Sequence, residues 1–311
     1  MKKNILISAA GTAAAWHIVN VIKKYFSDKM NVYICDTNPE HLVPASTLTD
    51  AFFQVPSVFD EGYYSYMLNL LIKEDIDIYV PLIDHDLLCF SQDNPDLIKN
   101  EIYSLAPNKA VAELVTDKKL MNEFLASIGI NVPALFLKNE IESNKEYFVK
   151  PRRGFGSRGA KILTGSEILV TDDIICQQLC TRPELTVEVY CTDKNLISLC
   201  RERIAMREGV STKAKCFYDD EIHSMIIKIA QNVTLPLASC IQFMKDSNNE
   251  WSLIDLNLRI GAGTALSAAI DFEIVRAVLY KILNDHEMID FLKIPSEPRY
   301  VVRVFNEVVT L

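Results

Sequence analysis

FVKPRRGFGSRGAKI, at residues 148–162, joins two short strands by a glycine-rich loop and carries the strongest indication of the fold. The first strand delivers Lys150, and the loop contains Gly154, Gly156 and Gly159. Glycine has no Cβ, so such a loop can bring backbone N–H groups close to phosphate oxygens. A P-loop sequence is absent, and the strand-to-strand context argues against a dinucleotide-binding fingerprint. The segment indicates a lid over phosphates; the alternative is a glycine-rich hairpin with solvated Arg and Lys.

The residues before this loop alternate between apolar strands and helical periodicity. Strands are predicted at 4–8, 32–35, 51–55 and 76–80, and helices at 12–24 and 61–73. Continuous apolar strands that alternate with helices are typical of a parallel sheet covered on both faces. We therefore expect an α/β, doubly wound unit over residues 1–110.

From residue 116 onward the pattern changes to an α+β unit. TDKKLMNEFLASIGI predicts a helix, with Thr116 as its N-cap and Gly129 just past its end. Further strands are predicted at 147–150, 160–163, 174–177, 185–191, 196–201, 238–244 and 251–256, with helices near 219–231 and 272–282. We expect a small lid subdomain over 111–180 and a larger subdomain over 181–311.

A second polar constellation lies in WSLIDLNLRIGAGTALS, at residues 251–267. Asp255, Asn257 and Arg259 alternate along a strand, so one face presents a carboxylate, an amide oxygen and a guanidinium together. Oxygen ligands beside a fixed cation suit Mg²⁺ that bridges nucleotide phosphates, and Gln242 on the preceding strand could add a ligand. The alternative is an edge strand with a polar outer face.

A third constellation is the arginine cluster in LCRERIAMREG. Arg201, Arg203 and Arg207 lie at the end of one strand and beyond it. Clustered guanidinium groups suit bidentate capture of carboxylate or phosphate. The alternative is a solvated basic patch paired with Glu202 and Glu208.

Composition excludes several functional classes. The 311 residues carry a formal net charge of −9, and no Lys or Arg run gives a nucleic-acid footprint. No apolar stretch approaches the roughly 18–20 residues of a membrane span, and MKKNILISAAG does not lead into a cleavage site. We expect a cytoplasmic protein with no nucleic-acid or membrane partner. Its eight Cys are interpreted as reduced core thiols, with a zinc or disulfide role as the alternative.

Taken in order, these segments resemble the ATP-grasp superfamily, and more narrowly the stand-alone proteins similar to the carbamoyl-phosphate synthase large subunit. NILISAAG, CDTNPEHLVPASTLTDAFFQVP and IYVPLIDHDL resemble the N-terminal pre-ATP-grasp unit, and TDKKLMNEFLASIGINVP resembles the start of the nucleotide-binding part. The resemblance spans nearly the whole chain. It implies an ATP-grasp fold with an N-terminal doubly wound domain, and ATP with Mg²⁺, or Mn²⁺, as cofactors.

The resemblance also implies roles for individual residues. The expected ATP phosphate contacts are Lys118, Lys150 and the loop that contains Gly154, Gly156 and Ser157. The expected adenine and ribose contacts are Gln177, Gln178, Leu179 and Glu184. The expected metal ligands are Gln242, Asp255 and Asn257. Arg203 and Arg259 match basic residues that face the transferred phosphate and the acyl phosphate, and Lys150 is counted with them as catalytic.

Two positions depart from the family pattern. Gln177 stands where many relatives have Glu, but it keeps an amide oxygen that can accept from the adenine amine. Asp255 replaces the usual Glu, and its stem is shorter by one C–C bond, roughly 1.5 Å. Mg²⁺ tolerates little misplacement of its ligands. The second metal is therefore expected to be weak unless the strand approaches more closely or a water intervenes.

The expected activity is that of a carboxylate–amine ligase, which forms an acyl phosphate from ATP and a small carboxylic or amino acid and passes the acyl group to an amine. Two alternatives remain open. One is a nucleotide-binding or regulatory subunit of a larger synthetase, and the other is phosphorylation of carbamate or carboxyphosphate, as in the synthase itself. The expected partners are small-molecule substrates and, because C₂ dimers are the commonest oligomers, a second copy of the chain.

Overall fold

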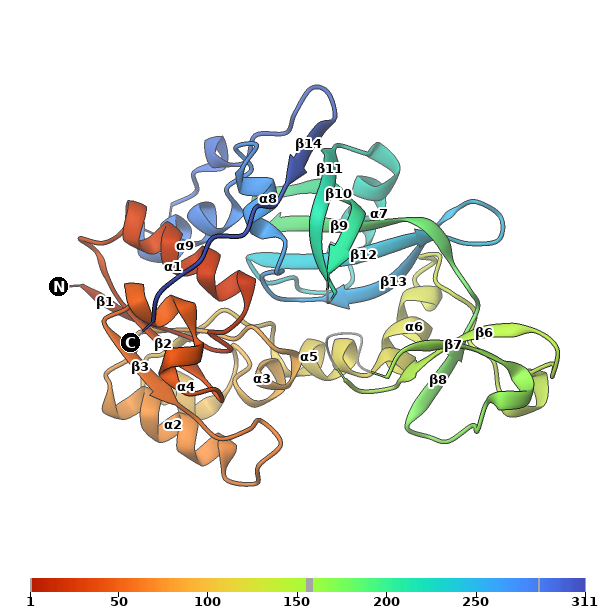
Figure 1. Cartoon of the computed structure of the whole chain (residues 1–311), viewed down its shortest axis with the longest axis horizontal. Helices are drawn as coiled ribbons and strands as arrows, with labels where there is room; N and C mark the ends of the chain where they lie inside the picture. Colours follow the sequence, from red (N-terminus) through yellow and green to blue (C-terminus); the bar gives the residue numbers. More distant parts are fainter. Residues whose placement is uncertain (1, 155–158, 208, 285, 311) are drawn as a thin grey trace.

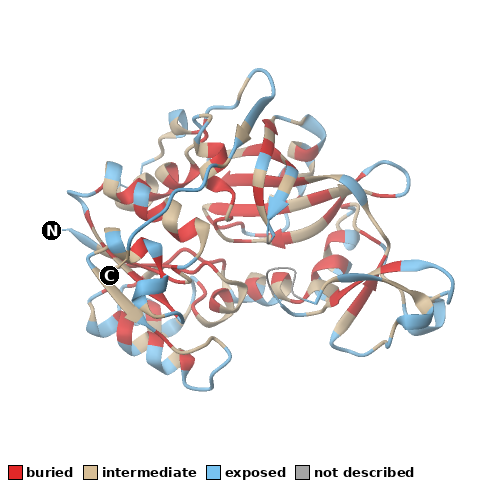
Figure 2. Cartoon of the chain, viewed as in Figure 1, coloured by how far each residue is buried: buried red, intermediate tan, exposed pale blue. Residues whose placement is uncertain are grey.

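The computed structural model describes residues 2–154, 159–207, 209–284 and 286–310. Its strands form a parallel five-stranded sheet, an antiparallel six-stranded sheet and a small antiparallel three-stranded sheet (Figure 1). The predicted combination of an N-terminal doubly wound unit with antiparallel sheets after it is confirmed. Buried residues follow the strands and the inner faces of the helices, while the loop tips are exposed (Figure 2).

The parallel sheet has the strand order β3-β2-β1-β4-β5. Its strands are β1 (Lys3–Ile7), β2 (Met30–Asp36), β3 (Ala51–Gln54), β4 (Ile78–Val80) and β5 (Tyr103–Ser104). Alternate residues of β1 face opposite sides: Ile5 and Ile7 belong to the core around α1 (Ala13–Tyr25), and Leu6 belongs to the core around α2 (Tyr63–Lys73). Both faces are therefore covered, as the continuous apolar strands predict.

Two helices connect this unit to the rest of the chain, α5 (Lys109–Thr116) and α6 (Lys118–Ser127). Thr116 is the last residue of α5, so its predicted role as an N-cap is wrong. Asp117 caps α6 instead, because its carboxylate accepts from the backbone N–H groups of Lys119 and Leu120 at 3.1 and 3.2 Å. Gly129 follows the end of α6 with φ +71°, a left-handed conformation that favours glycine.

The small sheet has the order β7-β6-β8 and the large sheet the order β13-β12-β9-β10-β11-β14. The small sheet consists of β6 (Glu146–Pro151), β7 (Lys161–Thr164) and β8 (Ile174–Gln177). The large sheet consists of β9 (Thr181–Cys191), β10 (Leu196–Arg207), β11 (Val210–Phe217), β12 (Ala238–Lys245), β13 (Trp251–Asn257) and β14 (Arg299–Val302). The three sheets lie within the three predicted ranges; the exact domain borders stay a prediction.

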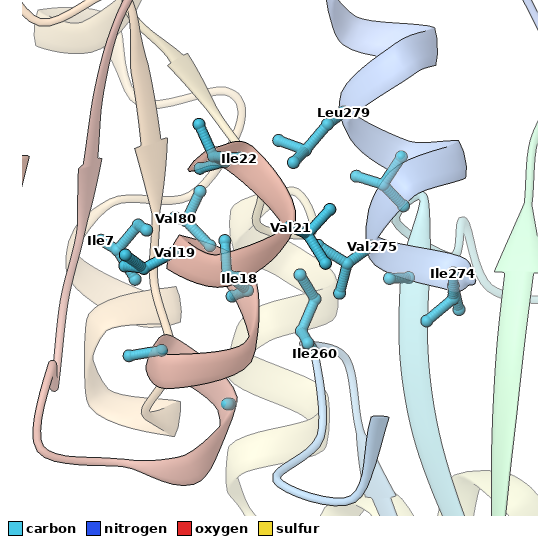
Figure 3. Packing of buried hydrophobic residues seen from close by; sticks show 14 of the residues in the cluster. Ile7, Ile18, Val19, Val21, Ile22, Val80, Ile260, Ile274, Val275 and Leu279 are labelled. Carbon is cyan, nitrogen blue, oxygen red and sulfur yellow. The ribbon is translucent and has the colours of Figure 1, made fainter. Parts of the chain in front are cut away.

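The core between the N-terminal unit and the large sheet forms around α1 and α9 (Ile274–Asn284). Figure 3 shows Val21 of α1 next to Val275 of α9, with Ile260 beside them, and Ile18 belongs to the same core. Ile260 follows the end of β13 and is 3% exposed. This shared core fixes the chain immediately beyond Asp255 and Asn257 against the N-terminal unit.

Other elements complete the fold. They are α3 (Asp84–Cys89), α4 (Pro95–Lys99), α7 (Asp220–Ala230), α8 (Thr264–Ala268) and the 3₁₀ turns η1 (Glu40–Leu42), η2 (Pro44–Leu48), η3 (Lys138–Glu140), η4 (Gly165–Glu167) and η5 (Ile289–Phe291). All eight cysteines are free thiols, five of them buried. In the part of the chain that the structure describes, no helix has the length and apolar character needed to cross a bilayer.

Gly263 packs so closely against Arg201 that no larger residue fits at this position. A Cβ at this position would overlap the guanidinium of Arg201, which cannot withdraw because its side chain is 2% exposed and bonded to Glu188 and Ser267. Gly263→Ala should lower the free energy of unfolding by about 1–3 kcal/mol, the range for overpacking a buried site. Urea unfolding measures this difference. Gly62→Ala is the control, because nothing lies within 4 Å of a Cβ there; equal stability of the two variants would contradict the prediction.

Candidate active site

A cavity of about 450 Å³ lies between the small sheet and the large sheet. Its size is within the range of small-molecule and cofactor sites. The predicted site residues that line it are Lys118, Lys150, Gly154, Gln177, Gln178, Leu179, Glu184, Arg203, Gln242, Asp255 and Asn257. Arg259 is not among its lining residues, and Gly156 and Ser157 lie outside the described residues. Residues distant in sequence are thus brought to one cavity.

Lys150 supplies a buried positive charge at the cavity wall. Its residue is 8% exposed, and its ammonium donates to the carbonyl oxygen of Ile254 at 3.0 Å. Burial lowers the pKa of Lys150, although the nearby Asp255 carboxylate acts in the opposite direction. No carboxylate forms a salt bridge with it among the residues that the structure describes. A buried ammonium with donors to spare is suited to an anionic ligand.

Lys118 ties the start of α6 to the glycine-rich loop. Its ammonium donates to the carbonyl oxygen of Gly154 at 2.7 Å, and its backbone N–H donates to that of Arg152 at 3.0 Å. Beside it, Arg152 and the buried Asp117 form an ion pair at 2.8 Å. Lys118 therefore attaches the start of the loop to α6, and Arg152 neutralises the charge of the Asp117 carboxylate that caps this helix.

Asp117 allows a prediction about pH. Burial by itself raises the pKa of Asp117, but hydrogen bonds from Arg152 and from the α6 backbone outweigh it and lower the pKa overall. A carboxyl whose pKa is lower in the folded state adds stability above its unfolded pKa, about 3.9, and loses it as the pH falls through the folded value. Asp117→Asn keeps a capping oxygen but removes the charge.

Asp117→Asn should therefore destabilise the protein by about 1.5–3 kcal/mol at pH 7, the range for hydrogen bonds to charged groups. The difference from the parent should shrink as the pH falls from about 4 toward 2. Chemical unfolding of both proteins as a function of pH measures it. A difference that stays constant over this range would contradict the assigned ion pair.

The predicted metal ligands come from the paired strands β12 and β13. Gln242 and Asp255 are direct partners in the antiparallel register, and Asn257 follows on the same strand. The Asn257 amide donates to Asp255 Oδ2 at 3.0 Å, which leaves the amide oxygen of Asn257 and Oδ1 of Asp255 as acceptors. Hard oxygen donors of this kind fit Mg²⁺. In the described ranges no three His, Cys, Asp or Glu come together as a metal site, so nucleotide phosphates would have to complete the coordination.

The segment after β8 offers backbone groups to a planar ligand. Gln177 is 2% exposed and lines the cavity. The N–H of Gln178 is already used, because it donates to the carbonyl oxygen of Ala134 at 2.9 Å. Gln178 and Leu179 lie between β8 and β9. Among the described residues, neither the carbonyl oxygen of Gln178 nor the N–H of Leu179 has a backbone hydrogen-bond partner. An acceptor next to a donor at a half-buried cavity edge matches the hydrogen-bonding edge of adenine.

Glu184 and Arg203 form an ion pair across the cavity wall, from β9 to β10. Arg203 also donates to Ser211 of β11 at 3.2 Å. Arg201, by contrast, is not among the lining residues and is buried against Glu188 and Ser267. Of the arginines in the predicted cluster, Arg203 is the one that lines the cavity.

Arg259 lies beyond β13 and contacts the N-terminal unit. Its Nε donates to Asp84 Oδ1 of α3 at 2.9 Å, with both side chains about one-fifth exposed, 19% and 20%. Asp84 itself lines the cavity. Sequence reasoning did not identify Asp84, because IDHDL carries no motif that distinguishes it from a helix-starting carboxylate.

Comparison with known protein families adds two matches. The model of the PylC-like, N-terminal domain matches residues 5–105, and the model of the ATP-grasp domain matches residues 115–263. Together they span the parallel sheet, the small sheet, and the large sheet through β13. No curated protein matches the chain.

Solved structures with the same fold share little sequence with the chain. The biotin carboxylase domain of 2-oxoglutarate carboxylase from Hydrogenobacter thermophilus, in complex with MgADP, ADP and bicarbonate, has a TM-score of 0.72 and 15% identity over 96% of this chain and 73% of that one. L-amino acid ligase from Bacillus licheniformis has a TM-score of 0.72 and 13% identity over 94% and 78%. N5-carboxyaminoimidazole ribonucleotide synthetase from Thermotoga maritima has a TM-score of 0.68 and 18% identity over 96% and 79%. At these identities the likeness shows the fold alone.

Proposed function

We propose that this chain, which belongs to the ATP-grasp superfamily, is an ATP-dependent ligase that activates a carboxylate as an acyl phosphate and passes the acyl group to an amine. The observation that carries the proposal is the cavity itself. The buried ammonium of Lys150 and the oxygen atoms of Asp255 and Asn257 that could bind a metal line the same cavity. The backbone groups of Gln178 and Leu179 lie at its edge. Phosphate, metal and adenine contacts are thus available in one place.

The proposed reaction has two steps. A carboxylate oxygen of the substrate attacks the γ-phosphorus of ATP, the bond to the β,γ-bridging oxygen breaks, and ADP leaves. The amine then attacks the carbonyl carbon of the acyl phosphate, inorganic phosphate leaves with the original carboxylate oxygen, and the amine loses a proton. Positioning and fixed charge supply most of the catalysis in phosphoryl transfer, because the protein forms no covalent bond.

The residues of the chain bind the phosphates and stabilise the negative charge that develops in the reaction. Lys150 and Lys118 bind the polyphosphate, and Arg203 and Arg259 stabilise the phosphoryl oxygens and then the tetrahedral oxyanion. Gln242, Asp255 and Asn257 would hold magnesium, which when bound neutralises charge on the nucleotide phosphates. Water has to be excluded from the cavity during the reaction, since hydrolysis of the acyl phosphate would waste ATP.

We further propose that the carboxylate is an amino acid or another small carboxylic acid. The remaining cavity lining supports this proposal, because Arg182 adds a guanidinium that suits a small carboxylate. The structural likeness to an L-amino acid ligase is consistent with it. The amine partner is a second small molecule.

Transfer of ¹⁸O tests the acyl phosphate route. With a substrate labelled at both carboxylate oxygens, one ¹⁸O should appear in inorganic phosphate for each amide formed, with ADP as the nucleotide product. Added hydroxylamine should yield a hydroxamate. Label in AMP would show adenylate chemistry, and unlabelled phosphate with no amide would show plain ATP hydrolysis; either result would overturn the proposal.

A further inference from the structure

We propose that Asp84 is a positioning residue for the reaction: it holds the Arg259 guanidinium by Nε and so aims the terminal nitrogens at the reacting phosphoryl group. The inference rests on the proposed function. It assigns to the N-terminal unit a part in catalysis, because Asp84 belongs to α3 while Arg259 follows β13 of the large sheet.

Arg259 uses one nitrogen for its bond to Asp84 and keeps its two terminal nitrogens for a ligand. Asp84 Oδ1 accepts from Arg259 Nε at 2.9 Å. In the described part of the chain, neither terminal nitrogen of Arg259 has a hydrogen-bond partner. A guanidinium carries five N–H donors in a rigid plane, so fixing Nε fixes the direction of the other four. Those four remain for phosphoryl oxygens.

Asp84 is itself held in place by its neighbour in α3. Asp86 is fully buried, and its carboxylate accepts from the hydroxyl of Ser8 at 2.6 Å and from that of Tyr63. The Ser8 hydroxyl oxygen also accepts from the backbone N–H of Leu82 at 3.1 Å. These bonds attach the start of α3 to the end of β1 and to α2, so Asp84 extends from a rigid support rather than from a free loop.

Arg259 is anchored on its other side. Ile260, the next residue, is buried in the core that α1 and α9 share (Figure 3). The backbone of Arg259 is therefore fixed against the N-terminal unit by packing, and its side chain is fixed by Asp84. Fixing both the backbone and the side chain preorganises the positive charge. An arginine that is free to rotate would lose transition-state stabilisation, because it would have to be ordered during the reaction.

A double-mutant cycle tests whether Asp84 acts through Arg259. In the parent background, Asp84→Ala should lower kcat by about 10–100-fold with little change in KM for ATP, and Asp84→Asn, which keeps an accepting oxygen, should recover most of this loss. In the Arg259→Ala background, Asp84→Ala should change kcat by less than about twofold. ADP release at saturating substrates measures all five proteins: the parent, the three single variants and the double variant.

If Asp84→Ala lowered kcat by the same factor in the parent and in the Arg259→Ala background, the inference would be overturned. An Asp84→Ala variant whose only change is a higher KM for the amine would also overturn it. The control is Tyr25→Phe, which removes another polar contact between the same two parts of the molecule, the bond from the Tyr25 hydroxyl to Glu273 at 3.2 Å. It should leave kcat within about twofold, because breaking that contact does not release Arg259.

A second measurement needs no turnover and separates this inference from the proposed function. In ¹⁵N-arginine-labelled protein, the Nε–H of Arg259 should be protected from water exchange in the parent and in Asp84→Asn, and should lose at least tenfold protection in Asp84→Ala. Unchanged protection in Asp84→Ala would overturn the positioning role even in an active enzyme. Protection that follows this pattern in a protein without ligase activity would instead count against the proposed function alone.

Discussion

Replacing Lys150 with methionine should lower kcat/KM for ATP by about 10²–10³-fold while leaving the protein at least as stable as the parent. The loss follows from removing a buried, fixed positive charge at the cavity wall, where electrostatic stabilisation is strong. The retained stability follows from burial. The pKa of Lys150 is lowered because its charged form is poorly solvated, so an apolar side chain of similar length suits the site.

Activity and unfolding measurements on the same preparations test this prediction. Lys161→Met is the matched control, because Lys161 is exposed on the neighbouring strand β7 and is paired with Val149 of β6. It should leave both quantities near parent values. If Lys150→Met kept parental activity, or unfolded more easily by several kcal/mol, Lys150 would be a structural residue rather than a phosphate ligand.

The second large effect is expected at Asp255. Asp255→Asn should lower kcat by at least about a hundredfold and raise the magnesium concentration needed for half-maximal rate, because an amide replaces the one carboxylate among the predicted ligands. The hydrogen bond from Asn257 to Asp255 can persist, since the new amide keeps an accepting oxygen. The loss should therefore concern the metal and not the local structure.

Asp255→Glu is the informative comparison, because it restores the longer side chain that is usual in the family. It should keep much more activity than Asp255→Asn and lower the magnesium requirement if the short stem weakens one metal. Titrations of ADP release with Mg²⁺ and with Mn²⁺ measure both effects. A magnesium dependence that is identical in the parent and in Asp255→Asn would contradict the proposed ligand set.

The order of motifs predicted most of the cavity because each local pattern reports a local structure. Alternation along β13 placed Asp255 and Asn257 on one face, and the strand before the glycine-rich loop placed Lys150 at the cavity wall. Binary patterning of this kind depends on neighbours two residues apart. Helix α6 was found for the same reason, although its N-cap was misplaced by one residue, because Thr116 and Asp117 are both good capping types.

Long-range pairing was not predictable in the same way. β14 is too short to stand out and is a strand because it pairs with β11, and β11 alternates lysines with small residues that resemble a loop. The Asp84–Arg259 contact joins residues 175 positions apart, and no pattern within either segment refers to the other. Arg201 and Arg203 lie on the same face of β10, and only their long-range partners separate them: Arg201 is buried against Glu188 and Ser267, and Arg203 pairs with Glu184 at the cavity.

Incubation of the purified protein with MgATP and mixtures of amino acids and small carboxylic acids tests the central claim most directly, with ADP release and product masses as the readouts. The proposal predicts ADP formation that depends on the added acid and amine, together with a new mass equal to the two substrates minus water. Clear ATP binding by calorimetry with no turnover in any mixture would contradict it and would favour a nucleotide-binding subunit of a larger synthetase.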